Sequence, residues 1–108
     1  MMNIAITTRG YKAPERLKKY LYEKLKRLER FADRIMNIEA VLSYENLDQV
    51  VEFKLRLNNK NIIVKEKSDD VFKSIDLAVD NLERQVTKVK EKIRTHNNKK
   101  IVEKLVEL

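Results

Sequence analysis

An apolar repeat in the C-terminal third of the chain constrains its fold most strongly. Seven apolar residues step alternately by three and four positions: Phe72, Ile75, Val79, Leu82, Val86, Val89 and Ile93. This spacing places them on one face of a helix, and we predict a long helix over residues 69–95. The region upstream is rich in strands and can receive this apolar stripe. The same repeat is also typical of a coiled coil, so a homodimerising adaptor module, paired through the stripe or through residues 101–108, is the alternative.

The charges of this predicted helix are divided along its length. Up to Glu83 it carries five acids and one base, and the residues that follow carry five bases and one acid. Acids near the start and bases near the end suit the helix dipole. The dipole does not explain why the cations Arg84, Lys88 and Lys92 recur at every fourth position, on the side opposite the apolar stripe.

The rest of the chain predicts one further helix and four strands. Residues 2–8 are rich in β-branched residues and indicate a strand, and Gly10, the only glycine, marks a turn. Pro14 suits the first position of a helix over residues 14–31. In the middle of the chain the apolar residues alternate instead, which predicts strands with one buried face at Met36, Ile38, Ala40, Leu42 and Tyr44, and at Val51, Phe53, Leu55 and Leu57.

Two turns complete the pattern. We expect one at residues 45–49 and a tight one at residues 58–61, where asparagine tolerates a positive φ. A fourth strand follows over residues 62–67, and Ser68, Asp69 and Asp70 are candidate caps of the long helix. The predicted fold is therefore α+β, in the order β-α-β-β-β-α, with two helices packed on one face of a four-stranded sheet. We expect a domain over residues 1–96, and a short flexible tail over residues 97–108 that begins at the polar break Asn97-Asn98.

Composition excludes several classes of function. The 108 residues contain no cysteine and one histidine, His96, so disulfides and thiolate metal sites are impossible and a catalytic histidine has no evident partner. No apolar run approaches the roughly 20 residues that a membrane helix needs. We therefore expect a cytoplasmic protein that is not an enzyme and has no cofactor, metal, membrane partner or small-molecule substrate.

The charge distribution indicates a polyanionic partner. The formal net charge is +7 and the pI is about 9.6, which favours nucleic acid or an anionic membrane surface. The helix over residues 14–31 holds seven bases and three acids, net +4, whereas residues 35–67 hold five of each. Helical geometry places Arg16, Lys19, Lys26 and Arg30 opposite the leucine stripe of this helix. Beside the basic row of the second helix they would form a cationic face whose acids are Glu23, Glu29 and Glu91 only, suited to phosphate contacts.

The chain also resembles a known family, the ribosome hibernation factors that include hibernation promoting factor and ribosome-associated inhibitor A. The resemblance covers about residues 2–96. It depends on the first strand with Arg9-Gly10, on LKKYLYEKLKRLERF in the first helix, and above all on DDVFKSIDLAVDNLERQVTKVKEKI in the second. In the second helix the family's aromatic-x-x-Ile-Asp pattern appears as Phe72 to Asp76, and its Leu-Glu-Arg-Gln-x-x-Lys run as Leu82 to Lys88.

The resemblance implies a fold similar in shape to double-stranded RNA-binding domains and a monomeric domain. It also implies binding to small-subunit rRNA, in single ribosomes or ribosome dimers (70S or 100S particles), in the channel between head and body. Messenger RNA and the aminoacyl- and peptidyl-site tRNAs would be excluded, so that translation stops and idle ribosomes are preserved. The positions that match the family's RNA-facing bases are Lys24, Arg27, Arg30, Arg84, Lys88, Lys90 and Lys92. Family members often have lysine where this chain has Asn81. The long forms add a linker and a second domain, so the resemblance implies either a short-form factor or the N-terminal domain of a long form.

Overall fold

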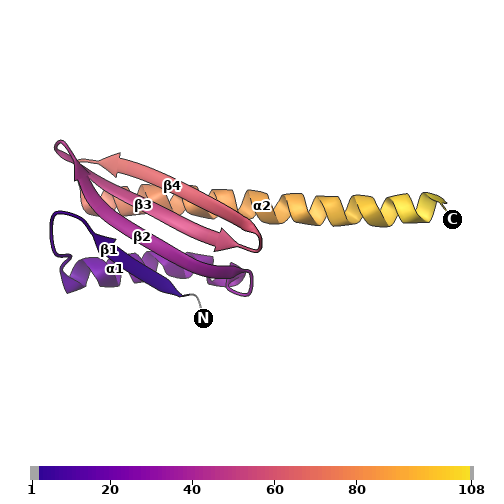
Figure 1. Cartoon of the computed structure of the whole chain (residues 1–108), viewed down its shortest axis with the longest axis horizontal. Coiled ribbons are helices and arrows are strands. Elements are labelled where there is room, and N and C mark those ends of the chain that lie inside the picture. The colour runs from indigo at the N-terminus through magenta and orange to yellow at the C-terminus, as the bar shows by residue number, and fades with distance from the viewer. Residues whose placement is uncertain (1–2, 108) are drawn as a thin grey trace.

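The chain forms a four-stranded sheet with both helices on one of its faces (Figure 1). The computed structural model describes the backbone of residues 3–107 and the side chains of residues 3–90. In chain order the elements are β1 (Ile4–Thr8), α1 (Glu15–Leu25), the 3₁₀ helix η1 (Lys26–Phe31), β2 (Ile35–Glu45), β3 (Asp48–Leu57), β4 (Lys60–Ser68) and α2 (Val71–Glu107). This confirms the predicted α+β class and element order. The likeness in shape to double-stranded RNA-binding domains stays a prediction.

The strands lie in the order β1-β2-β3-β4. β1 pairs with β2 in parallel, because α1 carries the chain back across the sheet between them, and the other two pairs are antiparallel hairpins. Alternate residues of each strand point toward the helices, such as Ala40 and Leu42 on β2 and Val51 and Phe53 on β3, and all four are fully buried. The opposite face of the sheet carries no helix (Figure 1).

The first helix is shorter and less regular than predicted. Pro14 is its N-cap, with extended backbone, rather than its first helical residue, and the α-helix ends at Leu25. The chain then continues as the 3₁₀ helix η1. A 3₁₀ helix has three residues per turn, and Leu25, Leu28 and Phe31, which step by three, are all buried. This spacing lets the tighter helix keep one apolar face against the core.

The register of β2 also differs from the prediction at its start. Met36, expected on the buried face, is 63% exposed, and Ile35 is buried in its place. The cause is an irregularity between Ile35 and Asn37 in the pairing with β3, since one extra residue reverses the inward and outward alternation. At the other end of the strand Tyr44, also expected inside, is half exposed.

The turns are tight and are made by residues with positive φ. Asn46 and Asn58, which begin the two hairpin turns, have φ values of 57° and 54°, a conformation that asparagine tolerates. The first turn is therefore shorter than the predicted residues 45–49, and β3 begins at Asp48. Gly10 has a φ of 87°, a conformation that side chains with a Cβ rarely adopt, so the turn after β1 favours glycine.

The long helix begins as predicted and extends further. The carboxylate of Asp70 accepts a hydrogen bond from the backbone N–H of Phe72, at 2.8 Å, which caps α2. The stripe residues Ile75, Val79, Leu82 and Val86 are fully buried in the common core, so this part of the stripe packs within the chain.

The C-terminal end of α2 departs from the prediction. The helix continues through Asn97 and Asn98 to Glu107, beyond the end of the sheet (Figure 1), with no backbone break at the two asparagines. Asparagine in a helix costs only a few tenths of a kcal/mol relative to most residues. The side chains of Ile93, His96 and residues 97–108 lie outside the described part, and the division into a domain and a tail stays a prediction.

Candidate nucleic-acid interface

The two helices present two rows of exposed cations on the side away from the sheet. The row on the first helix, named the α1 ridge, consists of Arg16, Lys19, Lys26 and Arg30. The row on α2, named the α2 ridge, consists of Lys73, Arg84 and Lys88. All seven side chains are exposed. The ridges arise because these positions lie opposite the buried apolar stripe of each helix.

Arg84 and Lys88 are adjacent on the α2 ridge. They are one helical turn apart, and neither forms an ion pair with a described side chain. Rows of unpaired cations suit phosphate oxygens, which give affinity but little sequence readout. Lys92 is on the same helix, but its side chain lies outside residues 3–90.

Arg30 and Lys90 meet at the ring of Phe31. The Arg30 guanidinium carbon lies 4.6 Å from the ring centroid and the Lys90 Nζ lies 5.2 Å from it. Both distances fall within the range of cation–π contacts. Although 60 residues apart in sequence, these two predicted site residues are therefore neighbours at the C-terminal end of the helix pair.

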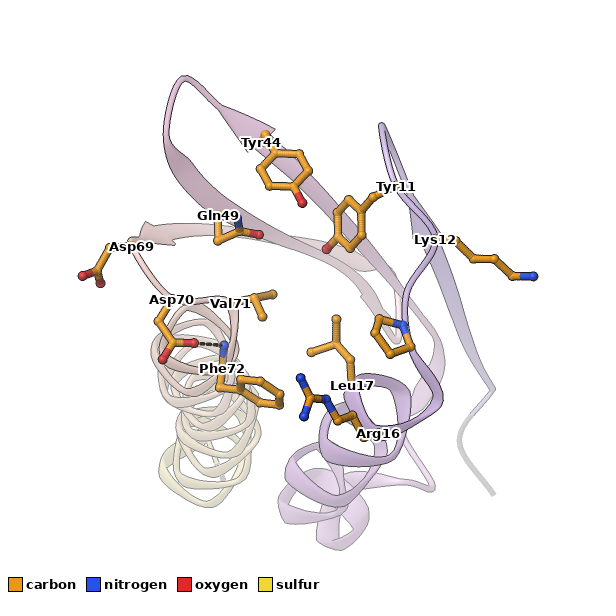
Figure 2. Close-up of a pocket in the computed structure, with 11 residues that line it drawn as sticks. Tyr11, Lys12, Arg16, Leu17, Tyr44, Gln49, Asp69, Asp70, Val71 and Phe72 are labelled. Atoms are coloured by element: carbon orange, nitrogen blue, oxygen red, sulfur yellow. Dashed lines mark hydrogen bonds between the residues drawn. The ribbon is translucent and has the colours of Figure 1, made fainter.

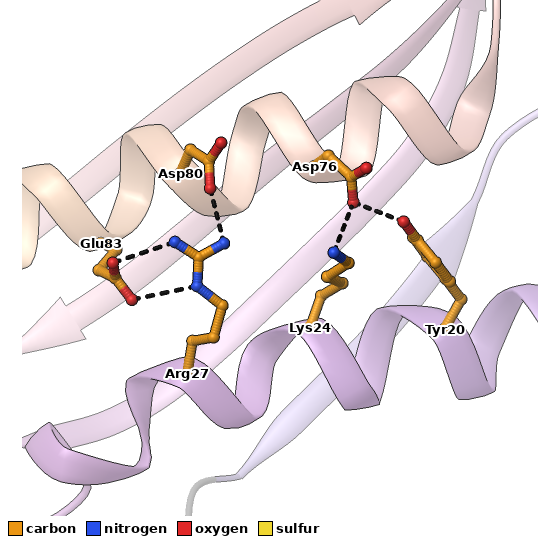
Figure 3. Close-up of polar contacts among 6 residues, drawn as sticks. All are labelled: Tyr20, Lys24, Arg27, Asp76, Asp80 and Glu83. Carbon is orange, nitrogen blue, oxygen red and sulfur yellow. Dashed lines mark hydrogen bonds and ion pairs between the residues drawn. The ribbon is translucent and has the colours of Figure 1, made fainter.

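Arg27 has a different environment from the one that the sequence predicts. Its guanidinium binds Glu83 through Nε at 3.3 Å and Nη2 at 3.0 Å, and Asp80 through Nη1 at 2.6 Å (Figure 3). The hydrogen bonds that Arg27 donates to Glu83, and then the one that it donates to Asp80, raise the pKa of Arg27 above its usual value. Two carboxylates compensate its charge, so Arg27 holds the first helix and α2 together.

Lys24 is paired in the same way. Its Nζ lies 3.3 Å from Asp76 Oδ1, and the Tyr20 hydroxyl donates to the same oxygen at 2.6 Å (Figure 3). The bond with Asp76 raises the pKa of Lys24. The hydrogen bond that Tyr20 donates to Asp76 raises the pKa of the Tyr20 phenol, and burial adds to that rise. The ammonium group of Lys24 is therefore already paired with a carboxylate of α2, and this pair would have to open before Lys24 could bind a phosphate directly.

These contacts correct the expectation that the cationic face has only Glu23, Glu29 and Glu91 as acids. Between the ridges lies a row of charged side chains, named the ionic seam, that consists of Lys24, Arg27, Asp76, Asp80 and Glu83. The sequence held a signal for it. Asp76, Asp80 and Glu83 are spaced by four and three residues, which places them beside the apolar stripe. This spacing indicates that they face a neighbouring helix, in addition to suiting the dipole of α2.

The uncovered face of the sheet is electrostatically different. Lys65 and Lys67 lie 2.6 and 3.9 Å from the carboxylate of Glu45, and Lys54 lies 3.8 Å from Glu52. The hydrogen bond from Lys65 lowers the pKa of Glu45. Three lysines of this face thus have carboxylate partners, whereas Arg84, Lys88, Lys90 and Arg30 have none among the described side chains.

A cleft of about 550 Å³ opens at the other end of the helix pair, between the starts of α1 and α2 (Figure 2). Tyr11, Tyr44 and Phe72 contribute aromatic walls, and the Tyr11 hydroxyl is buried without a hydrogen-bond partner among the described residues. Burial, and then the neighbouring Tyr44, raise the pKa of Tyr11. The lining includes two bases and two acids, so the cleft does not extend the cationic ridges.

Two further features bear on ligands. Asn81 donates a hydrogen bond to Glu66 on β4 at 3.0 Å, so its side chain makes a contact within the chain. Among the described residues there is no cluster of three or more side chains that could hold a metal ion. None of the described helices is both long and apolar enough to cross a membrane.

The comparisons with known proteins agree with this architecture. The family profile of the Sigma 54 modulation protein / S30EA ribosomal protein matches residues 4–94. The chain is similar to the ribosome hibernation promoting factor of Azotobacter vinelandii, with 33% identity over 91 residues, 84% of this chain and 85% of that protein. It is also similar to the factor of the same name from Escherichia coli, with 30% identity over 95 residues, 88% of this chain and 100% of that protein.

Two solved structures have the same fold. One is a ribosomal subunit interface protein from Coxiella burnetii, with a TM-score of 0.78 and 30% identity, over 84% of this chain and 99% of that one. The other is the N-terminal domain of Thermus thermophilus Protein Y, with a TM-score of 0.74 and 31% identity, over 82% of this chain and 99% of that one. The chain belongs to the Sigma 54 modulation protein / S30EA ribosomal protein family.

Proposed function

We propose that this chain is a ribosome hibernation factor that binds small-subunit rRNA through the outer surface of its two helices. One observation carries the proposal: Arg30, Arg84, Lys88 and Lys90 lie on that surface without a carboxylate partner among the described side chains. Relatives named ribosome hibernation promoting factor support it.

The proposed mechanism is steric. The protein would occupy the channel between the head and body of the small subunit, in place of messenger RNA and of the aminoacyl- and peptidyl-site tRNAs. The backbone spans 62 Å in its longest dimension and 27 Å in the next. Since the binding energy would come mainly from phosphate contacts, no catalytic group is needed, and the consequence is arrested translation in preserved ribosomes.

Co-sedimentation with ribosomes tests the proposed surface. The charge reversal R84E/K88E is expected to abolish co-sedimentation while circular dichroism shows an intact fold, because both side chains are exposed. The matched control is K54E/R56E, which makes the same change in net charge at two exposed positions of β3 that face away from the helices. The assignment of the surface would be overturned if both variants lost co-sedimentation equally, or if R84E/K88E still co-sedimented with ribosomes.

Competition with tRNA tests the proposed location. Ribosomes that carry tRNA in the aminoacyl and peptidyl sites should bind the protein much more weakly than empty ribosomes. Simultaneous full occupancy by both would contradict binding in the channel.

The adaptor alternative is less well supported by the fold. A dimer paired through the apolar stripe would need that stripe to be exposed, and Ile75, Val79, Leu82 and Val86 are fully buried within one chain. The alternative also allows a dimer paired through residues 101–108, and the side chains of these residues lie outside the described part of the chain.

A further inference from the structure

The charge of the helical surface changes sign twice across its width. The α1 ridge and the α2 ridge are cationic, whereas the ionic seam between them holds two cations and three carboxylates, net −1. Nothing in the packing requires this surplus, because Asp80 and Glu83 both bind the single cation Arg27. The carboxylates therefore lie in the middle of a surface that otherwise attracts phosphate.

We propose that the ionic seam makes this surface select paired RNA over a single strand. Paired RNA has two phosphate backbones, which can lie one on each ridge with the groove between them over the seam. A single strand can follow only one ridge, or must cross the carboxylates. This inference rests on the proposed function, because it assumes that RNA lies on the helices.

The geometry of the seam supports this selection. Packed helices have axes about 8–10 Å apart, so the ridges are separate tracks that two facing backbones can reach together. In water, a like charge roughly 8 Å from a phosphate lowers its affinity about twofold. Asp76, Asp80 and Glu83 are spread over two helical turns, so a backbone that follows the seam meets all three.

The seam cations do not cancel this effect. Arg27 uses three of its five N–H groups on Glu83 and Asp80, and Lys24 lies against Asp76. To bind phosphate directly, either cation would have to leave a carboxylate uncompensated. Arg27 and Lys24 therefore act as positioning residues that keep the ridges parallel, and the phosphate contacts are made by the two ridges and by Lys90.

The test compares two RNA probes with equal numbers of phosphates, a hairpin duplex and an unstructured single strand. Their dissociation constants are measured by fluorescence anisotropy in about 50 mM salt, where screening is weak. The variant D80N/E83Q removes two charges and preserves side-chain shape. We expect it to bind the single strand roughly three- to fivefold more tightly, with a smaller gain for the duplex, so that the preference for duplex narrows.

The matched control is E39Q/E52Q, which removes two carboxylates from the uncovered face of the sheet. Both positions alternate with buried residues of β2 and β3 and so face away from the helices. The proposal is overturned if the control narrows the preference equally, or if D80N/E83Q leaves the ratio of the two dissociation constants unchanged. The single variant D80N keeps both bonds between Arg27 and Glu83 and should shift the ratio in the same direction by about half, even if the double variant is unstable.

A separate variant distinguishes this inference from the proposed function. R84Q/K88Q should weaken the binding of both probes. If it weakens neither, RNA lies elsewhere on the protein and the proposed function fails first. If it weakens both while D80N/E83Q does not alter the preference, the surface is correct and only the selection by the seam is wrong.

Discussion

Arg27 shows how a residue can match a family's basic position and still have a structural role. It is 42% exposed, yet it makes three hydrogen bonds to two carboxylates of α2. A bidentate guanidinium–carboxylate contact is the strongest kind of surface ion pair. At the residue scale, the cations of this protein therefore divide into those that hold the helices together and those that remain available.

Replacement of Arg27 by methionine should lower the free energy of unfolding by about 0.5–1 kcal/mol, because a partly exposed ion-pair network is lost. Urea denaturation measures the change. The control K26M removes only an exposed contact with Glu23 within the first helix and should have a smaller effect. Equal destabilisation by the two variants would show that Arg27 does not clamp the helices.

The Tyr20–Asp76 hydrogen bond predicts a dependence of stability on pH. The pKa of Tyr20 is raised above its ordinary value of 10.0 in the folded state, so the folded protein retains this proton at a pH where the unfolded chain has lost it. The contribution is fully present below pH 10 and is lost as the pH rises through the folded pKa. The variant Y20F, which keeps the edge-to-face contact with Phe72, should be less stable than the parent near pH 8, and the difference should shrink in alkali. A constant difference between pH 8 and 11 would contradict this account.

At the scale of elements, the start of β2 provides a test of register. Ile35 is 5% exposed and Met36 is 63% exposed. We expect Ile35→Ala to cost about 2–4 kcal/mol, since it removes buried methyl groups, and Met36→Ala to stay within about 0.5 kcal/mol. Chemical denaturation of the two variants measures this directly. A larger loss of stability for Met36→Ala than for Ile35→Ala would instead indicate that Met36 is the buried residue, as the regular alternation in the sequence predicts.

At the scale of the whole molecule, α2 extends beyond the sheet. Among the side chains of residues 3–90, the last fully buried stripe residue is Val86, and the backbone of α2 continues to Glu107. We predict that a chain ending at residue 96 folds, is monomeric and co-sediments with ribosomes to the same extent as the full chain. Light scattering and sedimentation give the two readouts. Loss of binding on truncation would move part of the interface into residues 97–108.

The sequence predicts the helices and strands well where periodicity is strong. The stripe of α2 and the alternation of β3 have the expected faces, because burial on one side imposes a period on the sequence. The exposure of Met36 was missed because a bulge shifts the inward and outward alternation of β2. The 3₁₀ helix η1 was missed because a change of helix type shifts the spacing of the apolar residues locally. Neither change alters the composition of the segment. The ionic seam was missed for a different reason. The spacing of Asp76, Asp80 and Glu83 indicates that they lie beside the apolar stripe, but whether Asp80 and Glu83 compensate Arg27 depends on how the two helices pack.

The salt dependence of binding to purified small subunits tests the central claim most directly. Each phosphate contact contributes roughly one unit to the slope of log K against log salt. R84Q/K88Q should therefore reduce that slope by about 2, and the control K54Q/R56Q, on the face of the sheet without helices, should leave it unchanged. Equal slopes for the parent protein and R84Q/K88Q would contradict the claim that the outer surface of the two helices binds rRNA.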